Sequence, residues 1–311
     1  MAYRGQIIKA MSGFYYVRPD RDEKIEGSPS EEPVTFQCRA KGIFRRNNIT
    51  PLVGDRVLFD LTETDDVEGN VTEILDRKNF LIRPRVANVD QALVIFALHT
   101  PEPATELLDR FLVGMRSKEI PVILVFNKDD LGNEGDIEGF RDIYREAGVK
   151  LLFTSALEHS GIDGVKELLR DKLTTVAGPS GAGKSSLINA LSGRELMSTG
   201  DLSRKTGRGK QTTRHTELIE IEDGSFIIDT PGFSSLEFDG LEAEKLDSLF
   251  PEIDRYKNEC YFTGCSHINE PGCGVKNRLS EGLIPKERYG SYVLFYKELA
   301  AVKESRLRSR K

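Results

Sequence analysis

Residues 176–189 read Val-Ala-Gly-Pro-Ser-Gly-Ala-Gly-Lys-Ser-Ser-Leu-Ile-Asn, and they predict a phosphate-binding loop between a strand and a helix. Within this stretch, Gly178, Gly183, Lys184 and Ser185 have the spacing Gly-x4-Gly-Lys-Ser. The glycines let backbone N–H groups curl around phosphate oxygens at a helix N-terminus, where the helix dipole favours an anion. A β-prone run precedes the loop and a helix-like run follows it, so the stretch predicts binding of a nucleoside triphosphate.

We expect the whole loop to contact the phosphates. Lys184 would reach the β- and γ-phosphates and act in catalysis, and Ser185 would hold Mg²⁺. The expected contacts are Gly178, Pro179, Ser180, Gly181, Ala182, Gly183, Lys184, Ser185 and Ser186.

Length and composition indicate a multidomain globular protein. A chain of 311 residues is long enough for two or three domains, and no apolar run approaches the ~18 residues that span a bilayer. The first residues lack the apolar core of a secretory signal. We therefore expect a cytoplasmic monomer without membrane contact. The net charge of −6 disfavours a general nucleic-acid binder unless the basic residues cluster.

Residues 1–82 predict an all-β OB-fold barrel, because about five short strands alternate with turns. This OB-like setting, together with the basic segment described next, favours RNA binding. Residues 39–49 gather basic and amide side chains around Phe44. Cations for phosphates beside an aromatic ring for stacking are typical of single-stranded nucleic-acid grooves, although a solvated charged hairpin remains an alternative. Cys38 lies on an expected strand and is interpreted as a small buried hydrophobe.

Residues 83–240 alternate strands and helices and predict a doubly wound α/β domain, whose ligands bind at the carboxyl ends of parallel strands. An amphipathic helix is expected over 103–119. Residues 241–311 predict a helical domain with helices over 242–250, 276–282 and 286–306 and a basic tail.

Two motifs of the α/β region indicate guanine. Asn127-Lys128-Asp129-Asp130 fits Asn-Lys-x-Asp, in which the Asp130 carboxylate accepts from the guanine N1–H and 2-amino groups that adenine lacks in this arrangement. Asn127 would tie the loops together, and the Lys128 stem would cover the ring. Ser155-Ala156, at the next strand end, would offer a backbone N–H to guanine O6.

Two further segments predict the γ-phosphate and magnesium side of the site. In Asp229-x-x-Gly232, the carboxylate would lie beside Mg²⁺ and the glycine N–H near the γ-phosphate. Thr213, or its neighbour Thr212, would complete the Mg²⁺ shell. The guanine motif precedes the phosphate loop, so the domain is circularly permuted relative to ordinary small GTPases. Since Asp229 leads directly to residues 240–311, we expect nucleotide state to bias the orientation of that domain.

Three cysteines and a histidine fall within fourteen residues near the C-terminus. The pattern Cys260-x4-Cys265-x-His267-x5-Cys273 supplies a closed set of four ligands with no open position, as in structural zinc sites. Free buried thiols beside a surface histidine are the alternative.

Over nearly its whole length the chain resembles the RsgA family of circularly permuted GTPases, also called EngC or YjeQ/YloQ. The resemblance rests on Thr50-Pro-Leu-Val-Gly-Asp55, Arg83-Pro, Asn88-Val-Asp-Gln91, Leu108-Asp-Arg-Phe111, residues 178–189, Gly207-Arg-Gly-Lys-x-Thr-Thr-Arg-His215, Asp229-Thr-Pro-Gly-Phe-Ser-Ser-Leu236 and the cysteine cluster. It implies an OB-fold, a permuted GTPase domain and a zinc-containing helical domain. It also implies late maturation of the small ribosomal subunit near its decoding region, with rRNA contact and release upon subunit-stimulated GTP hydrolysis.

Two positions bear on catalysis. Phe233 follows Gly232 where Ras-like enzymes place a water-orienting glutamine, so intrinsic hydrolysis should be slow. Gln211 stands where the family usually has histidine and is a candidate for positioning water; a solvent-exposed switch residue is the alternative. A nucleotide-gated RNA-binding regulator with incidental hydrolysis is the second functional hypothesis, and a P-loop ATPase, which Asp130 disfavours, is the third.

Overall fold

The computed structural model describes residues 2–23, 25, 34–64, 67–82, 85–197, 216–222, 224–229, 238 and 240–308. The chain forms two compact units. The first comprises residues 1–91, 168–176 and 201–233, and the second comprises residues 92–167, 177–200 and 234–311.

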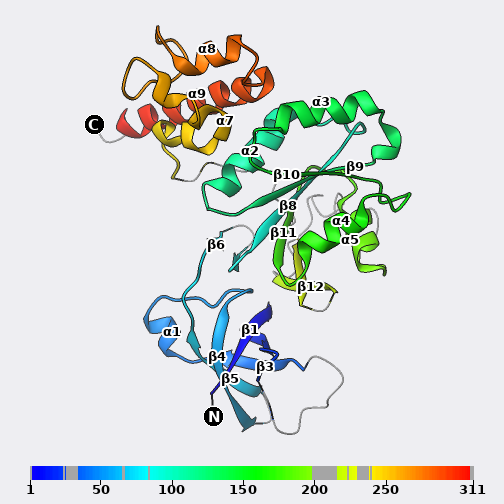
Figure 1. The fold of residues 1–311 in the computed structure, drawn as a ribbon. Coiled ribbons are helices and arrows are strands. Elements are labelled where there is room, and N and C mark those ends of the chain that lie inside the picture. Colours follow the sequence, from blue (N-terminus) through cyan, green and yellow to red (C-terminus); the bar gives the residue numbers. More distant parts are fainter. Residues whose placement is uncertain are drawn as a thin grey trace. The chain divides into compact units, whose positions relative to one another are not determined.

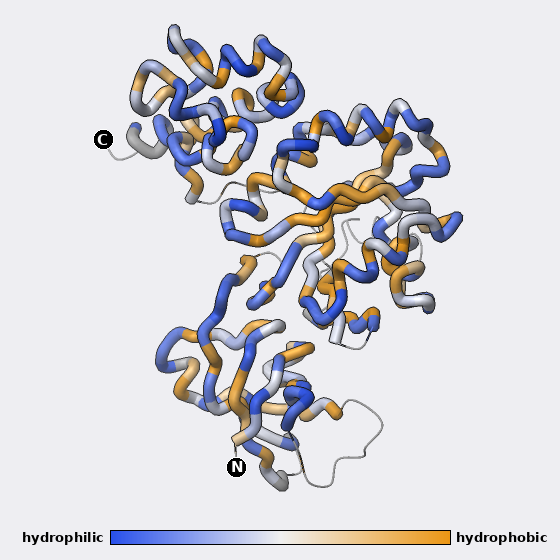
Figure 2. The backbone as a smooth tube through the Cα atoms, in the orientation of Figure 1, coloured by the Kyte–Doolittle hydropathy of each residue, from blue (hydrophilic) through white to orange (hydrophobic). Residues whose placement is uncertain are grey.

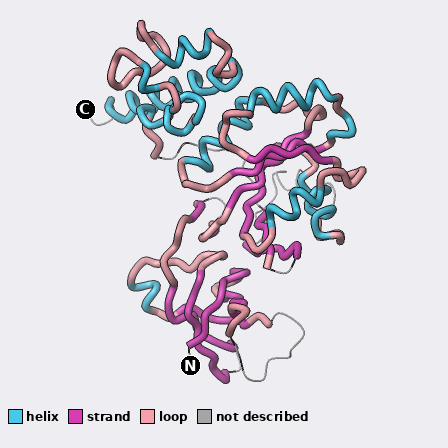
Figure 3. Tube along the Cα trace, viewed as in Figure 1, coloured by secondary structure: helices cyan, strands magenta, loops and turns pink. Residues whose placement is uncertain are grey.

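The first unit contains a closed five-stranded barrel (Figures 1 and 3), as predicted. Its strands are β1 (Ala2–Met11), β2 (Phe14–Pro19), β3 (Phe36–Ala40), β4 (Arg56–Thr64) and β5 (Val67–Ile74). They pair in the order β1-β2-β3-β5-β4, and β1 closes the barrel by pairing with β4, for example Tyr3 opposite Phe59. Cys38 is fully buried in this barrel, so its interpretation as a core residue is confirmed.

The predicted stacking role of Phe44 is wrong. Residues Ile43–Arg46 form a short helix, α1, from which Phe44 turns inward and is only 7% exposed. An aromatic ring among cations satisfied the sequence pattern, but burial of its apolar surface outweighs exposure in a loop. The cations Lys41 and Arg46 remain at the surface.

The first unit also contains three strands of the α/β region. A hairpin of β12 (Thr216–Glu222) and β13 (Ser225–Asp229) pairs along β13 with the parallel strand β11 (Leu173–Ala177). Strand β12 pairs on its other side with the barrel strand β1, where Lys9 lies opposite Glu217 and Ala10 opposite Thr216. The short strands β6 (Phe80–Leu81) and β7 (Val86–Ala87) form a separate pair.

The second unit contains the remaining parallel strands in the order β10-β9-β8. Every residue of β8 is buried, and Figure 2 shows the hydrophobic character of these central strands. The elements are β8 (Gln91–Ala97), α2 (Thr105–Arg116), β9 (Val122–Asn127), α3 (Glu134–Tyr144), β10 (Lys150–Thr154), α4 (Ile162–Leu169) and α5 (Lys184–Ser192). The apolar stripe predicted for the first of these helices is buried at Leu108, Phe111, Leu112 and Met115.

The second unit ends in a helical domain of α7 (Pro251–Asp254), α8 (Gly274–Ser280) and α9 (Lys286–Arg308) (Figure 1). The prediction of an α-helix over residues 242–250 is wrong. Two 3-10 turns, η2 (Ala243–Lys245) and η3 (Asp247–Leu249), occupy it, and their apolar side chains Ala243, Leu246 and Phe250 are buried in the domain core. Tertiary packing therefore overrides local helix preference here. Among the described helices, none combines the length and apolar character of a membrane span.

Candidate nucleotide and metal sites

The phosphate loop has a backbone that only glycine can follow at two points. Gly178 has φ +140°, and a Cβ there would lie 2.0 Å from the Ile95 carbonyl oxygen. Gly183 has φ +85°, and a Cβ there would lie 2.3 Å from Asn127 Nδ2. The two motif glycines are thus required by a positive φ and by close approach of neighbouring strand ends.

Helix α5 begins directly after the loop, at Lys184. The Lys184 ammonium lies back across the loop and donates to the carbonyl oxygens of Gly178, at 3.0 Å, and Pro179, at 2.7 Å. Ser185 is buried in the first turn of α5, whereas Ser186 is exposed. The first turn of α5 and the curled loop therefore combine backbone N–H groups with a cation, which suits a polyphosphate.

Asn127, at the end of β9, connects three segments. Its Nδ2 donates to the Ala182 carbonyl oxygen of the phosphate loop, at 3.1 Å. Its Oδ1 accepts from Thr154 Oγ1 and from the Ala156 amide, both at 3.1 Å. Because Asn127 is 1% exposed, these bonds fix the phosphate loop, the guanine motif and the loop after β10 relative to one another.

The guanine motif continues into a 3-10 turn, η1 (Asp129–Leu131). Lys128 has φ +64° and donates through Nζ to the Thr100 carbonyl oxygen at 2.7 Å. The Oδ1 atom of Asp130 is buried and has no hydrogen-bond partner among the described residues. A buried, unpartnered carboxylate oxygen is unfavourable unless a ligand supplies donors, and guanine N1–H and the 2-amino group are such donors.

The loop after β10 is closed by a residue pair. Ser155 and Ser160 exchange backbone hydrogen bonds, Ser155 N to Ser160 O at 3.2 Å and Ser160 N to Ser155 O at 3.1 Å. The Ala156 amide, expected to reach guanine O6, is directed at Asn127 Oδ1 in this structure. The loop after β10 is thus bonded to the guanine motif at Asn127.

Several predicted residues lie outside the described part of the chain. They are Gln211, Thr213 with its neighbour Thr212, and Gly232, so the water-positioning, magnesium and γ-phosphate predictions remain predictions. Asp229 ends β13 opposite Val176, and its side chain also lies outside the described part.

Three residues of the site had no motif to reveal them: Thr100, Thr154 and Ser160. Thr154 lies directly before Ser155-Ala156, so its position at the strand end was a usable signal. Thr100 takes part through its carbonyl oxygen, and Ser160 through loop closure and through its hydroxyl, which contacts Asp129 Oδ1. Neither role has a residue pattern.

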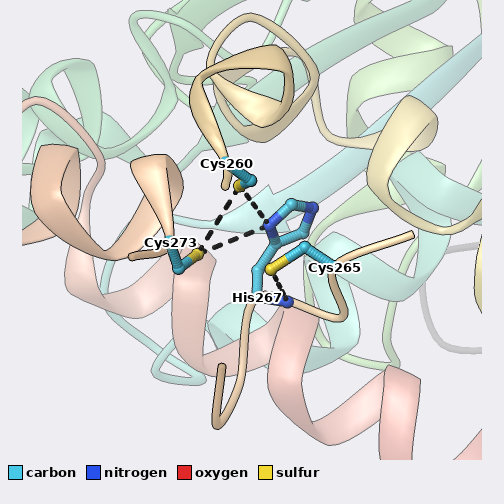
Figure 4. Close-up of side chains that lie close together, drawn as sticks. All are labelled: Cys260, Cys265, His267 and Cys273. Carbon is cyan, nitrogen blue, oxygen red and sulfur yellow. Dashed lines mark hydrogen bonds between the residues drawn. The ribbon is translucent and has the colours of Figure 1, made fainter. Parts of the chain in front are cut away.

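The four metal-ligand candidates converge in the helical domain (Figure 4). The ligand atoms of Cys260, Cys265, His267 and Cys273 all lie within 4.8 Å of one another. His267 Nδ1 lies 3.4 Å from the Cys260 sulfur and 3.5 Å from the Cys273 sulfur, and these two sulfurs are 3.8 Å apart. Tetrahedral zinc with ordinary bond lengths separates two sulfurs by about 3.8 Å and a sulfur from a nitrogen by about 3.5 Å. Cys260, His267 and Cys273 match these separations, and Cys265, within 4.8 Å of them, is the fourth candidate ligand.

Groups around the cluster orient its ligands. His267 Nε2 faces Asp247 Oδ2 at 4.0 Å, which leaves Nδ1 toward the sulfurs. Tyr289 donates to the His267 carbonyl oxygen at 2.7 Å. The Glu270 carboxylate accepts from the backbone amides of Ser266, Ile268 and Asn269 and so braces the loop that carries His267.

Comparison with known proteins gives a consistent result along the chain. The family model described as RsgA N-terminal domain matches residues 4–69, and that described as RsgA GTPase matches residues 74–239. A protein of Agathobacter rectalis named small ribosomal subunit biogenesis GTPase RsgA is 49% identical over 295 residues, which are 95% of this chain and 97% of that protein. A protein of the same name from Geobacillus kaustophilus is 45% identical, with the same shares covered.

Solved structures agree. YjeQ from Thermotoga maritima has a TM-score of 0.79 and 34% identity, covering 96% of this chain and 99% of that chain. The structure titled as YloQ, a circularly permuted GTPase, has a TM-score of 0.77 and 38% identity, covering 97% and 96%.

Proposed function

Since the chain belongs to the RsgA GTPase family and is a GTP-hydrolysing enzyme, we propose that it acts in biogenesis of the small ribosomal subunit. The finer proposal is that it contacts rRNA near the decoding region late in maturation and is released when the subunit stimulates hydrolysis. The observation that supports a role in small-subunit biogenesis is similarity over nearly the full length to proteins named small ribosomal subunit biogenesis GTPase RsgA.

The residues of the site have distinct proposed tasks. Asp130 selects guanine through its buried acceptor, while Asn127 holds the guanine and phosphate loops together. Lys184 and the backbone of residues 178–186 bind the phosphates. Mg²⁺, when bound, neutralises charge on the β- and γ-phosphate oxygens, and Ser185 and Thr213 would hold it. Asp229 and Gly232 would complete the γ-phosphate side.

The remaining assignments are part of the same proposal. We divide the chain into residues 1–82, an RNA-binding OB-fold; residues 83–240, the permuted GTPase domain; and residues 241–311, the helical domain with one structural zinc ion. A factor with a ribosomal partner is expected in the cytoplasm, as a monomer and without membrane contact.

The test is GTP hydrolysis with and without small ribosomal subunits. Stimulation by orders of magnitude supports the proposal, because a supplied catalytic group contributes roughly 10³–10⁵ in rate. No stimulation would favour the second hypothesis, a nucleotide-gated RNA-binding regulator with incidental hydrolysis. The segment Asp229-Thr-Pro-Gly-Phe233 supports that hypothesis, because it lacks a glutamine that could orient water.

Two variants test individual residues. Asp130→Asn should lose the preference for GTP over xanthosine triphosphate, and full retention of that preference would remove the guanine assignment.

Gln211→Ala should slow single-turnover hydrolysis on small subunits if Gln211 positions water, and an unchanged stimulated rate would exclude that role.

A further inference from the structure

The hydroxyl of Ser160 connects the two loops that would recognise guanine. Ser160 Oγ donates to Asp129 Oδ1 at 3.2 Å and accepts from the Ser155 amide at 3.0 Å. The hydroxyl donates in the first bond and accepts in the second, because a carboxylate oxygen accepts and a backbone N–H can only donate. A hydroxyl, with one proton and two lone pairs, satisfies both at once.

Each partner of this hydroxyl is the chain neighbour of a base-recognising group. Asp129 precedes Asp130 in the same 3-10 turn, η1, so a bond to Asp129 limits movement of the turn that presents the Asp130 carboxylate. Ser155 precedes Ala156, whose amide lies on Asn127 Oδ1. Ser160 therefore contacts the chain neighbours of both groups proposed to bind guanine, without being part of either motif.

The backbone gives Ser160 little freedom to adopt another position. His159 before it has φ +57° and Gly161 after it has φ +69°. A Cβ at Gly161 would lie 2.3 Å from the Phe153 carbonyl oxygen, so the chain turns tightly against β10 there. Ser155 Oγ also accepts from the Glu158 amide at 3.1 Å, which closes the loop from inside.

We propose that Ser160 is a positioning residue for guanine specificity: its hydroxyl bridges Asp129 and Ser155 and thereby holds the Asp130 carboxylate in register with the loop containing Ala156. This inference rests on the proposed guanine site. It adds a determinant of specificity that lies outside both guanine motifs.

The experiment measures affinities of the full chain for GDP and for inosine diphosphate, which lacks only the 2-amino group that Asp130 would bind. For Ser160→Ala we expect GDP affinity to fall by about 3–10-fold, the effect of losing one hydrogen bond of ordinary net strength. Affinity for inosine diphosphate should fall less, so the preference for GDP shrinks. Ser160→Thr keeps the hydroxyl and should restore both values.

Controls separate positioning from general destabilisation. Ser280→Ala removes an exposed hydroxyl that donates to the Asn277 carbonyl oxygen in the helical domain, and it should leave both affinities unchanged. Equal losses for the two nucleotides, or unchanged GDP affinity in Ser160→Ala, would overturn the role of Ser160. A wild-type chain that bound both nucleotides equally would instead overturn the guanine assignment itself.

Discussion

Two polar clusters hold the C-terminal helical domain, and they differ in what they connect. The Cys/His cluster joins residues 260–273, which are close in sequence. The second, which we call the Arg288 cluster, consists of Arg288, Asp109 and Glu252 and joins α9, α2 and α7. Its guanidinium is fully buried and donates through Nε to Glu252 Oε1, at 2.6 Å, and through Nη1 to Asp109 Oδ1.

Two aromatic rings pack against the Arg288 cluster, and a second arginine lies near it. The guanidinium carbon of Arg288 lies 4.7 Å from the centre of the Phe250 ring and 5.5 Å from that of Tyr144. Burial raises the pKa of Asp109, an effect that the Arg288 charge opposes. Nearby, Arg116 at the end of α2 donates to the carbonyl oxygens of Leu249 and Ala147, both at 2.6 Å.

The difference indicates a division of labour. The Cys/His cluster closes loops inside the domain, whereas the Arg288 cluster attaches the domain to α2. The prediction that nucleotide state changes the orientation of residues 240–311 stays a prediction, and the Arg288 cluster constrains it. Any such change must move α2 together with the domain or break the Arg288–Asp109 contact.

Metal removal should have the largest effect. Structural zinc contributes on the order of 10 kcal/mol to folding of small metal-bound units, so Cys265→Ser should lose the metal and unfold residues 241–308. Metal analysis, circular dichroism and limited proteolysis check this. The matched control Cys38→Ala removes the cysteine outside the cluster and should keep one metal per chain. A Cys265→Ser chain with full metal content and an intact helical domain would contradict the structural role.

Next in size is loss of the Arg288 cluster. Arg288→Met leaves two buried carboxylates without a cation, which should cost about 3–5 kcal/mol of unfolding free energy in urea titration. Adding Asp109→Asn and Glu252→Gln removes the unpaired charges and should recover part of the loss. If the triple variant is no more stable than Arg288→Met, buried charge is not the cause.

A smaller, pH-dependent effect is expected at Glu270. Burial alone would raise the pKa of its carboxyl, but hydrogen bonds from Ser266 and from backbone amides outweigh burial and lower the pKa from 4.5 to about 2. A depressed pKa stabilises the fold above about pH 4.5, and this contribution is lost as the pH falls toward 2. Glu270→Gln should therefore be less stable than the wild type at neutral pH, and the two stabilities should converge in acid. A difference that stays constant with pH would show that the charge is not involved.

The smallest effect is expected at the exposed edge of the contact between α2 and α9. Arg110 and Glu298 form a two-point ion pair, at 3.0 and 2.6 Å, but the Glu298 side chain is 43% exposed. Glu298→Gln should cost less than about 1 kcal/mol. Arg110→Ala should cost more, because the guanidinium also lies over the rings of Phe238 and Phe295. If Glu298→Gln matched Arg288→Met, exposure would not separate the two interactions.

Sequence patterns were sufficient where chemistry is local. The phosphate loop, the barrel strands and the Cys/His cluster were predicted because each depends on residues within a few positions. In the Arg288 cluster, Arg288 contacts Glu252 and Asp109, which lie 36 and 179 positions before it in the chain, and no local pattern connects these residues. Phe44 was misinterpreted for a related reason, since composition does not indicate which way a side chain turns.

The pairing of β1 with β12 has a consequence for folding during synthesis. The barrel can close once β4 and β5 have emerged, but the end of β1 must wait for residues about 200 positions later. At roughly 5–20 residues per second, that strand edge stays open for about 10–40 s on the ribosome. An open edge invites pairing with other chains, and a charged residue on it discourages this. Lys9 is such a residue in the nascent barrel, before Glu217 arrives as its ion-pair partner at 2.9 Å.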